Sequence, residues 1–447
     1  MINTLFLPEL REMLADENQA ELEEFCTALN PARTAEFMEG LANNEIWRVL
    51  QYSDPQRRAE VFDYFDHNRK VEILDQQPSG EVAALVEHLA EDDRVDLLQD
   101  VDDQRADEIL ALLPVVERRN ILRLLSFPEG TAGALMTTEV AKLTEGLTVQ
   151  QAIDSLARRS EDLETIYYLY VIDDDEQLRG VVSARQLIAF LARGGTPLQE
   201  LMETDIVAAM VNEDQESVAE KVERYNLLAI PVVDSTRHLL GVITHDDVID
   251  VVREELTEDI QQIAGVSPLE EEFLRINLFR LGWKRGIWLT ILFFAAMLTA
   301  FVLKSYNTTI ENITWLMWFL PLVLSSGGNS GSQSATLVIT ALTSGEVTPS
   351  DWLKIVGREI IVALQLGGFL AVLGFVVGQI IQLQGTAAIV VPLTLIAVVM
   401  GGCLCGATLP LLFKRLGLDP ALMSNPFVAG LVDILGIVTY VTIAQLL

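Results

Sequence analysis

The chain has 447 residues, half of them hydrophobic, and a formal net charge of −33. The two properties are separated along the sequence, because residues 1–275 hold 58 acidic and 23 basic residues whereas residues 276–447 hold 6 acidic and 8 basic ones. An excess of 35 negative charges in the first part repels phosphate backbones and anionic lipids, so it argues against nucleic acid as a partner and favours cations. The three cysteines have neither disulfide nor zinc spacing, which indicates a reducing compartment.

Residues 1–130 are predicted to form an acidic, all-α domain. Segments such as RADEILALLPVVERRNILRLL repeat apolar residues at spacings of three and four, and prolines separate the short units. The alternatives are an ordinary helical domain and a stack of helical repeats, and the recurring helix–turn–helix units favour the stack. The N-terminal stretch lacks a basic start followed by an apolar core, so we expect no signal peptide and a cytosolic N-terminal half.

Residues 131–252 contain an internal repeat of about 60 residues. LMTTEVAKLTEGLTVQQAIDSL corresponds to LMETDIVAAMVNEDQESVAEKV, and YVIDDDEQLRGVVSARQLIAFL corresponds to PVVDSTRHLLGVITHDDVIDVV. Each copy predicts an α/β unit, with Gly180 and Gly241 closing equivalent hairpins. The pattern resembles a tandem pair of CBS domains, which implies a regulatory module that senses nucleotides or ions rather than a catalyst.

Residues 253–275 are predicted to form a charged connecting helix that leads to the membrane part. Its first turns are crowded with the acids Glu254, Glu255, Glu258 and Asp259. From the residues alone, this segment is either a solvated linker helix or a functional element.

Residues 276–447 are predicted to form an α-helical membrane domain with five spans. The spans lie near 286–303, 314–342, 355–382, 388–413 and 421–446. Basic residues before the first span and after the second and fourth place the N-terminus in the cytosol and the C-terminus outside the cell membrane. Because five spans cannot form two equal halves, we expect a symmetric homodimer.

The last span carries an acid, Asp433, near its middle. An ionised carboxylate at the centre of a membrane helix costs about 2.5–3.5 kcal/mol, so it is a functional candidate by default. Asp433 could relay protons, pair with a buried cation or bind an ion. No Lys, Arg or His lies in the centre of another span, which favours a transported cation over a structural ion pair.

The second span has a polar centre, SSGGNSGSQS, between apolar ends. On a helix, Ser325, Asn329, Ser332 and Thr336 share one face, and Gln333 lies beside it. These side chains either line an ion pathway or pack helices together, and the two amides favour the pathway. In the fifth span, Asn425, Ala429, Asp433 and Gly436 lie along one face. The predicted pore residues are Asp433, Gly328, Asn329, Gln333, Asn425 and Ala429.

Oxygen ligands of this kind suit a hard cation such as Mg²⁺, which retains its waters and takes one or two carboxylates. The order of the parts, together with PLVLSSGGNSGSQSATLVITAL and DPALMSNPFVAGLVDILG, resembles the MgtE family of magnesium channels and transporters. The resemblance implies a homodimeric Mg²⁺-selective channel in the cell membrane that cytosolic Mg²⁺ closes, with ATP as a further ligand of the CBS pair. It implies that the connecting helix plugs the pore.

The resemblance also implies a set of regulatory Mg²⁺ ligands. They are Glu60, Asp92, Asp96, Glu216, Asp247, Asp250, Glu255, Glu258, Asp259 and Asp419. Two positions depart from the family pattern, because Asn226 replaces an acid and Ser332 replaces a common Asn.

Physically, the acidic surplus suggests a gate in which bare domains repel one another and Mg²⁺ bridges their carboxylates. A proton- or Na⁺-coupled divalent-cation carrier is the alternative within the same class. A membrane-anchored nucleotide sensor is the alternative from another class. The sequence has no nucleophile–base pair and no hydrolase metal motif, so we do not expect an enzyme.

Overall fold

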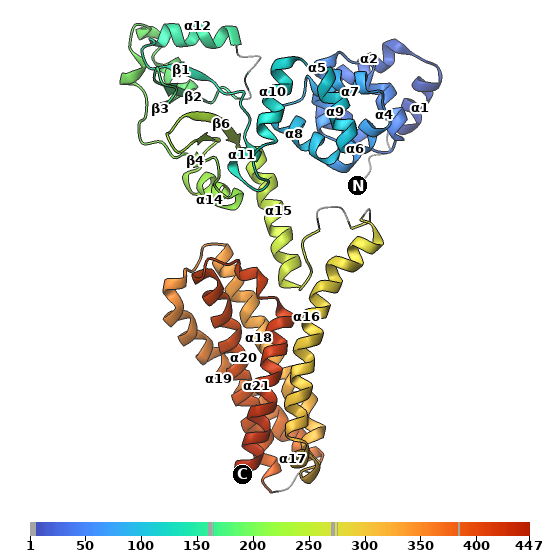
Figure 1. Ribbon diagram of the computed structural model, residues 1–447, viewed down its shortest axis with the longest axis vertical. Helices are drawn as coiled ribbons and strands as arrows, with labels where there is room; N and C mark the ends of the chain where they lie inside the picture. The colour runs from blue at the N-terminus through green and yellow to red at the C-terminus, as the bar shows by residue number, and fades with distance from the viewer. Residues whose placement is uncertain (1–5, 160–162, 164, 270–272, 275, 383–384) are drawn as a thin grey trace. The chain divides into compact units, whose positions relative to one another are not determined.

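A computed structural model describes residues 6–159, 163, 165–269, 273–274, 276–382 and 385–447. The chain divides into an N-terminal unit, Met1–Arg253, and a C-terminal unit, Glu254–Leu447 (Figure 1). The repeat predicted for 131–252 includes residues 160–162 and 164, and the connecting helix predicted for 253–275 includes residues 270–272 and 275. These residues lie outside the described part of the chain.

The first half of the N-terminal unit is helical, as predicted. Its helices are α1 (Leu7–Ala15), α2 (Gln19–Ala28), α3 (Pro31–Met38), α4 (Asn43–Leu50), α5 (Pro55–Asp63), α6 (His67–Asp75), α7 (Ser79–Val86), α8 (Glu91–Asp100), α9 (Asp103–Leu112) and α10 (Val115–Leu124).

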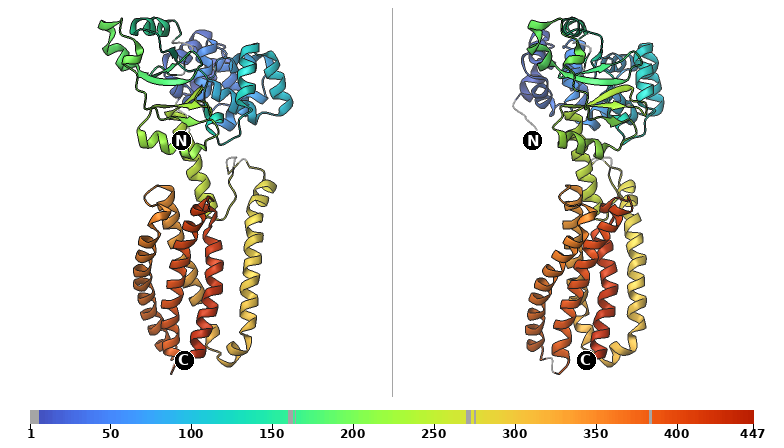
Figure 2. Two further views of the ribbon diagram at one scale, coloured as in Figure 1. Left: turned by 60° about the vertical axis from the view of Figure 1, so that its left-hand side comes forward. Right: turned by 90° about the vertical axis from the view of Figure 1, so that its left-hand side faces the viewer.

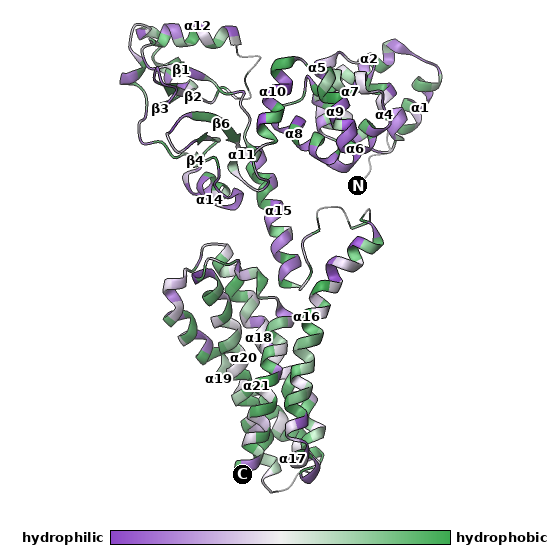
Figure 3. Ribbon diagram, viewed as in Figure 1, coloured by the Kyte–Doolittle hydropathy of each residue, from purple (hydrophilic) through white to green (hydrophobic). Residues whose placement is uncertain are grey.

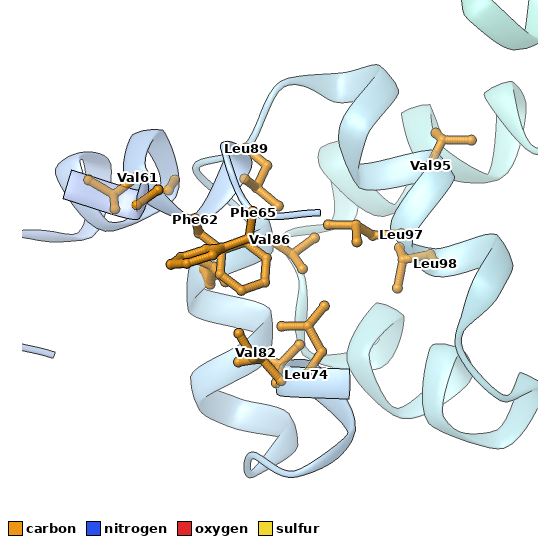
Figure 4. Close-up of a cluster of buried hydrophobic side chains, with 14 of the residues drawn as sticks. Val61, Phe62, Phe65, Leu74, Val82, Val86, Leu89, Val95, Leu97 and Leu98 are labelled. Atoms are coloured by element: carbon orange, nitrogen blue, oxygen red, sulfur yellow. The ribbon is translucent and has the colours of Figure 1, made fainter. Parts of the chain in front are cut away.

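Local sequence explains the starts of several of these short helices. The side chain of Asn30 caps α3 by accepting a hydrogen bond from the backbone N–H of Ala32. The side chain of Asp54 caps α5 by accepting one from the backbone N–H of Arg57. Pro31 and Pro55 follow these caps, at the first helical position, where a missing N–H costs nothing. The apolar faces then meet in a continuous core, part of which Figure 4 shows with Phe62, Phe65 and Val86 at its centre.

The second half of this unit contains the predicted repeat. Its elements are α11 (Ala132–Leu135), β1 (Lys142–Thr144), α12 (Val149–Arg159), β2 (Tyr168–Ile172), β3 (Leu178–Ser183), α13 (Ala184–Ala189), β4 (Ala209–Met210), α14 (Gln215–Tyr225), β5 (Ala229–Val233), β6 (Leu239–Thr244) and α15 (His245–Ile263), whose last turns belong to the C-terminal unit.

The described residues form two three-stranded sheets with the same topology. In each sheet the first strand runs parallel to the second, and the second is antiparallel to the third. The expectation that Gly180 and Gly241 close hairpins is wrong, because they lie inside β3 and β6 opposite Val171 and Val232. A Cβ on Gly241 would lie 2.4 Å from the carbonyl oxygen of Thr137, so close backbone approach explains this glycine.

The C-terminal unit is a set of long helices, predominantly hydrophobic in Figure 3. They are α16 (Leu278–Ser305), α17 (Asn307–Asn312), α18 (Leu316–Thr343), α19 (Trp352–Ile380), α20 (Ala387–Arg415) and α21 (Asn425–Leu446), with short 3-10 turns at Pro349–Asp351 and Pro420–Leu422. Figures 1 and 2 show them side by side; α20 contacts α18, α19 and α21, whereas α16 stands at the edge against α21.

Four helices within the described residues are long and apolar enough to cross a membrane. They are Leu278–Ser305, Pro349–Ile380, Ala387–Arg415 and Asn425–Leu446. The expected second span, 314–342, corresponds to α18, which has 28 residues. Its polar centre lowers its mean hydropathy, so it is not among these four helices. The predicted number of five spans is therefore not confirmed by length and hydropathy.

Glycines let α18 approach its neighbours at backbone distance. A Cβ placed on Gly406 of α20 would lie 2.1 Å from the carbonyl oxygen of Gly331 in α18, and one placed on Gly402 would lie 2.5 Å from that of Gly327. A Cβ on Gly327 would meet Val398 at 2.4 Å and Val432 at 3.0 Å. Small residues at such crossings are how membrane helices pack in the absence of a hydrophobic driving force.

We predict that Gly406→Ala separates α18 from α20, since the obstacle is backbone that cannot move aside. The expected loss is about 1–3 kcal/mol, as for other overpacked sites, seen as a lower melting temperature of the detergent-solubilised protein. Gly401→Ala, in the same helix with nothing within 4 Å of its Cβ position, is the matched control. Equal melting temperatures for the two variants would contradict the proposed contact.

Candidate functional site

Asp433 lies on α21, partly buried, in contact with the polar centre of α18. A Cβ on Gly328 would be 3.7 Å from its Oδ1 atom and 3.4 Å from the Cβ of Ala429. Three of the predicted pore residues are thus brought together. Asp433 forms no hydrogen bond or ion pair with any residue that the structure describes.

The polar side chains at the centre of α18 fall into two sets, one that contacts α21 and one that is exposed. Ser332 donates a hydrogen bond to the backbone oxygen of Asn425 at 3.1 Å, and Thr336 donates one to its Oδ1 atom at 3.1 Å. Both hydroxyls therefore serve to tie α18 to the first residue of α21. The serine that departs from the family pattern, Ser332, fills this structural position.

Ser325, Asn329 and Gln333 lie four residues apart on the exposed side of α18. The Nδ2 atom of Asn329 donates a hydrogen bond to the hydroxyl of Ser325 at 3.2 Å. The amide oxygens of Asn329 and Gln333 therefore remain available on one exposed stripe of α18. The predicted shared face of Ser325, Asn329, Ser332 and Thr336 is thus split by the structure into an exposed stripe and a packed edge.

A residue that the sequence analysis did not select is Glu359, on α19. Its Oε2 atom accepts a hydrogen bond from the hydroxyl of Ser334 on α18 at 2.6 Å, and Ser334 is buried. The rule that identified Asp433 would have found it, because Glu359 also lies inside a predicted span, 355–382.

The acids of the connecting helix lie in the last turns of α15. Glu255, Glu258 and Asp259 are partly buried there. Burial, followed by the charges of Asp419, Glu255 and Glu258, raises the pKa of Asp259 to about 6, against a smaller opposing effect of Lys414. The exposed Asp419 caps the short turn before α21 by accepting a hydrogen bond from Ala421 N–H at 2.8 Å.

The end of α15 packs onto the start of α21. Ile263 contacts the apolar cluster that contains Val428, and a Cβ on Gly265 would lie 3.4 Å from Pro426. Gln262 and Ser424 are buried here, and the Gln262 Oε1 and Ser424 Oγ atoms have no hydrogen-bond partner in the described structure. The end of the connecting helix therefore packs on the start of α21 with unsatisfied oxygen atoms at the contact.

A second group of acids lies in the N-terminal unit, around α8. Burial raises the pKa of Asp247 to about 6, opposed by hydrogen bonds from Thr244 and reinforced by the charges of Asp246 and Asp96. Burial and the neighbouring Asp63 likewise raise the pKa of Asp93, which was not predicted, to about 7.

Asp96 and Asp247 are thus close enough to interact, although they belong to the helical half and to the repeat half. The nearby Lys70 ammonium contacts Asp63 at 2.9 Å and Asp93 at 3.8 Å and offsets part of this charge.

The remaining predicted regulatory residues are dispersed. Glu60 is exposed and pairs with Arg57 at 3.0 Å, and Asp250 pairs with Arg253 at 3.4 Å. Asp92 is partly buried on α8, and Glu216 lies in the first turn of α14. In the part of the chain that the structure describes, no three His, Cys, Asp or Glu side chains come together in a group that could hold a metal.

Asn226, where the resemblance led us to expect an acid, ends α14 in the left-handed conformation at φ 50°. Asn tolerates this conformation better than most residues. The substitution therefore has a local backbone reason in this chain.

The CBS pair contains a cavity of about 410 Å³. It is lined by Tyr167, Tyr168, Val181, Ser183, Ala184, Arg185, Gln186, Glu203 and Leu228. A second cavity of about 200 Å³ shares Tyr168, Val181 and Glu203 with it and is also lined by Tyr225. Aromatic rings and a guanidinium group beside a hollow can stack a base and contact phosphate.

Helices long and apolar enough to cross a membrane, one with an acid near its middle, together with a repeat of the CBS type, are typical of the class of membrane transport proteins with a regulatory module. Family models agree with the three parts: a divalent cation transporter model, MgtE, matches residues 320–443, the MgtE intracellular N domain matches 29–130, and the CBS domain matches 132–193 and 198–254. The chain is 34% identical over 443 residues to the magnesium transporter MgtE of Thermus thermophilus, covering 98% of this chain and 97% of that protein.

The magnesium transporter MgtE of Enterococcus faecalis is 30% identical over 440 residues, covering 98% of this chain and 96% of that protein. The chain therefore belongs to the MgtE family of magnesium transporters, whose members are named as transporters rather than enzymes. It is also similar to the solved soluble part of a magnesium transporter, with TM-score 0.52, 32% identity and coverage of 56% of this chain and 97% of that one.

A further solved structure is the cytosolic domain of the Mg²⁺ channel MgtE in complex with ATP. It has TM-score 0.51 and 33% identity to this chain and covers 54% of this chain and 98% of its own.

Docking of α15 is predicted to depend on pH in the absence of divalent cations. The pKa of Asp259 is about 6 when α15 is docked, so a protonated Asp259 carboxyl stabilises the docked state. This stabilisation is complete below about pH 4 and is lost as the pH rises through 6. Asp259→Asn should therefore increase amide hydrogen-exchange protection of residues 254–266 by roughly tenfold at pH 7 and by nothing at pH 4. Glu254→Gln, at an exposed position of the same helix, is the control; equal protection of Asp259→Asn and wild type at pH 7 would refute this.

Proposed function

We propose that this chain imports Mg²⁺ across the cell membrane along a pathway beside α18 and α21, with Asp433 as the ligand of the passing ion. The observation that carries the proposal is the position of Asp433: it is partly buried beside Gly328 and Ala429 and has no described protein counter-ion. A cation with retained waters would compensate the carboxylate, as Mg²⁺ does with one or two carboxylates.

In this proposal α18 also crosses the membrane, as the second of five spans. The chain then has the four parts 1–130, 131–252, 253–275 and 276–447, with the N-terminus in the cytosol and the C-terminus outside. A helix with the exposed polar stripe Ser325, Asn329 and Gln333 is unfavourable against lipid. A second copy of the chain, related by a two-fold axis, would cover the stripe and bring two Asp433 side chains to one pathway. The functional form is therefore a homodimer.

Cytosolic Mg²⁺ closes this pathway by binding between the docked α15 and the start of α21. The support is electrostatic, because Asp259 is crowded by Asp419 and its own neighbours, and a divalent cation would remove the repulsion. The acids Asp96 and Asp247 repel one another in the same way in the N-terminal unit. In the hydrogen-exchange experiment above, Mg²⁺ should protect residues 254–266 of the wild type and protect Asp419→Asn less.

A nucleotide such as ATP is proposed as a ligand of the CBS pair. The cavity offers the rings of Tyr167 and Tyr168 for the base and Arg185 for phosphate. Glu203 lines the same cavity and would repel phosphate, so a cation bound with the nucleotide fits the site better than the free anion.

Flux measurements in proteoliposomes test the transport proposal. With Mg²⁺-free buffer on the cytosolic side, the wild type should admit Mg²⁺, and Asp433→Ala should fall to the level of protein-free vesicles because the ion loses its carboxylate ligand. Glu346→Gln, which neutralises an exposed acid outside the helices, should transport like the wild type. Normal uptake by Asp433→Ala would refute the pore assignment.

The same assay separates the alternatives. Uptake that follows an imposed membrane potential without a pH or Na⁺ gradient supports a channel, whereas dependence on either gradient supports the coupled carrier. No divalent flux in the wild type would favour a membrane-anchored nucleotide sensor.

Calorimetric titration of the full-length protein with ATP and Mg²⁺ tests the nucleotide site. Tyr168→Ala should weaken binding by about tenfold, which is a typical loss for one base–aromatic stack. Tyr64→Ala, which removes an exposed tyrosine of the helical half, is the control. Unchanged affinity in Tyr168→Ala would place the nucleotide elsewhere.

A further inference from the structure

Glu359, like Asp433, is an acid inside a candidate membrane span. It lies on α19, which contacts α20, and its carboxylate reaches α18 through the hydroxyl of Ser334 at 2.6 Å. Ser334 is only 4% exposed, so its hydroxyl has little access to water. A carboxylate placed among apolar helices is costly, and such residues generally mark a functional position.

The bond between Ser334 and Glu359 differs from the hydrogen bonds that the hydroxyl of Ser330 donates within α18. The hydroxyl of Ser330 donates to the carbonyl oxygens of Ser326 and Gly327 in its own helix, at 2.8 and 3.0 Å. That bond adds no connection between helices. Ser334, one turn further on, directs its hydroxyl to α19 instead.

One turn of α18 is consequently held from two sides. Ser332 and Thr336 are tied to Asn425 of α21, and Ser334 is tied to Glu359 of α19. Gln333 lies between these anchors and is exposed. The two ties fix the rotation of the helix about its axis and hence the direction in which the Gln333 amide points.

The backbone contacts at this level make such a rotation consequential. A Cβ on Gly331 would lie 3.2 Å from the carbonyl oxygen of Gly402, and one on Gly406 would lie 2.1 Å from that of Gly331. Because the two backbones are in such close contact, a change in the rotation of α18 cannot be absorbed by side chains alone and would move Gln333. A ligand displaced by as little as 1 Å loses much of its effect.

We propose that Glu359 is a positioning residue that acts through Ser334 to orient the turn of α18 carrying Gln333, and so sets how well the pathway distinguishes Mg²⁺ from other divalent cations. The inference rests on the proposed function, because it assigns Gln333 to the ion pathway. The role belongs to the hydrogen-bond acceptor at position 359 rather than to its charge.

The test compares Glu359→Gln, Glu359→Leu, Ser334→Ala and the double variant Glu359→Leu/Ser334→Ala in proteoliposomes. Mg²⁺ uptake and the ratio of Mg²⁺ to Co²⁺ uptake are measured for each full-length protein. Glu359→Leu and Ser334→Ala should each lower Mg²⁺ uptake by about tenfold, the equilibrium factor of one hydrogen bond to a charged group, and should lower the ratio. The double variant should be no worse than either single one.

Glu359→Gln should retain uptake and ratio, because its amide oxygen can still accept the bond from Ser334. Glu346→Gln is the control for loss of an acid elsewhere. The inference is overturned if Glu359→Leu transports and discriminates like the wild type, or if Glu359→Gln is as defective as Glu359→Leu, which would assign the role to charge.

Loss of folded protein in detergent that accounts for all of the uptake loss, with an unchanged ratio, would also overturn the inference in favour of a purely structural role. A wild-type protein that carries no Mg²⁺ would overturn the proposed function, and this inference with it. That outcome is distinguishable because the wild type itself fails.

Discussion

The close backbone contact of α18 with α20 and α21 determines what can surround Asp433. Gly327, Gly328 and Gly331 have no side chains, which lets α21 come close enough for Asp433 to face the backbone of α18. The same glycines leave no side chain on that surface that could neutralise the carboxylate. Compensation must then come from outside the chain, and a hydrated cation is the species that can arrive and leave. In the proposed pathway, packing and transport thus depend on the same residues.

Carboxylates with raised pKa values occur in both of the regions that we propose to be regulatory. The pKa values of Asp93, Asp247 and Asp259 are all raised, with burial as the largest cause and neighbouring acids as a further one. None of these groups forms a preformed metal cluster within the described residues. Folding therefore places acids near one another without completing a site. Such an arrangement is sensitive to divalent cations, because the ion removes an existing repulsion as well as forming new bonds.

The sequence predicted the kind of each element better than its contacts. Helical periodicity and the internal repeat identified the helical half and the CBS pair, since both patterns are local. Gly180 and Gly241 were assigned to hairpin turns because glycine is common there, whereas their actual role is to allow close approach between segments distant in sequence. No local pattern encodes such a contact.

In the candidate site, too, the sequence could identify some residues but not the contacts between them. Asp433 was predictable from the cost of a charge in a membrane helix, and Glu359 could have been found by the same reasoning. The division of α18 into an exposed stripe and a packed edge could not, because Ser332 and Ser325 differ only in what lies opposite them. Hydropathy likewise excludes α18 from the candidate spans although it is as long as α16. A helix with polar side chains along its length is a poor lipid-facing span and a good lining for water and ions. The feature that weakens its membrane signal is thus the one that the proposed pathway requires.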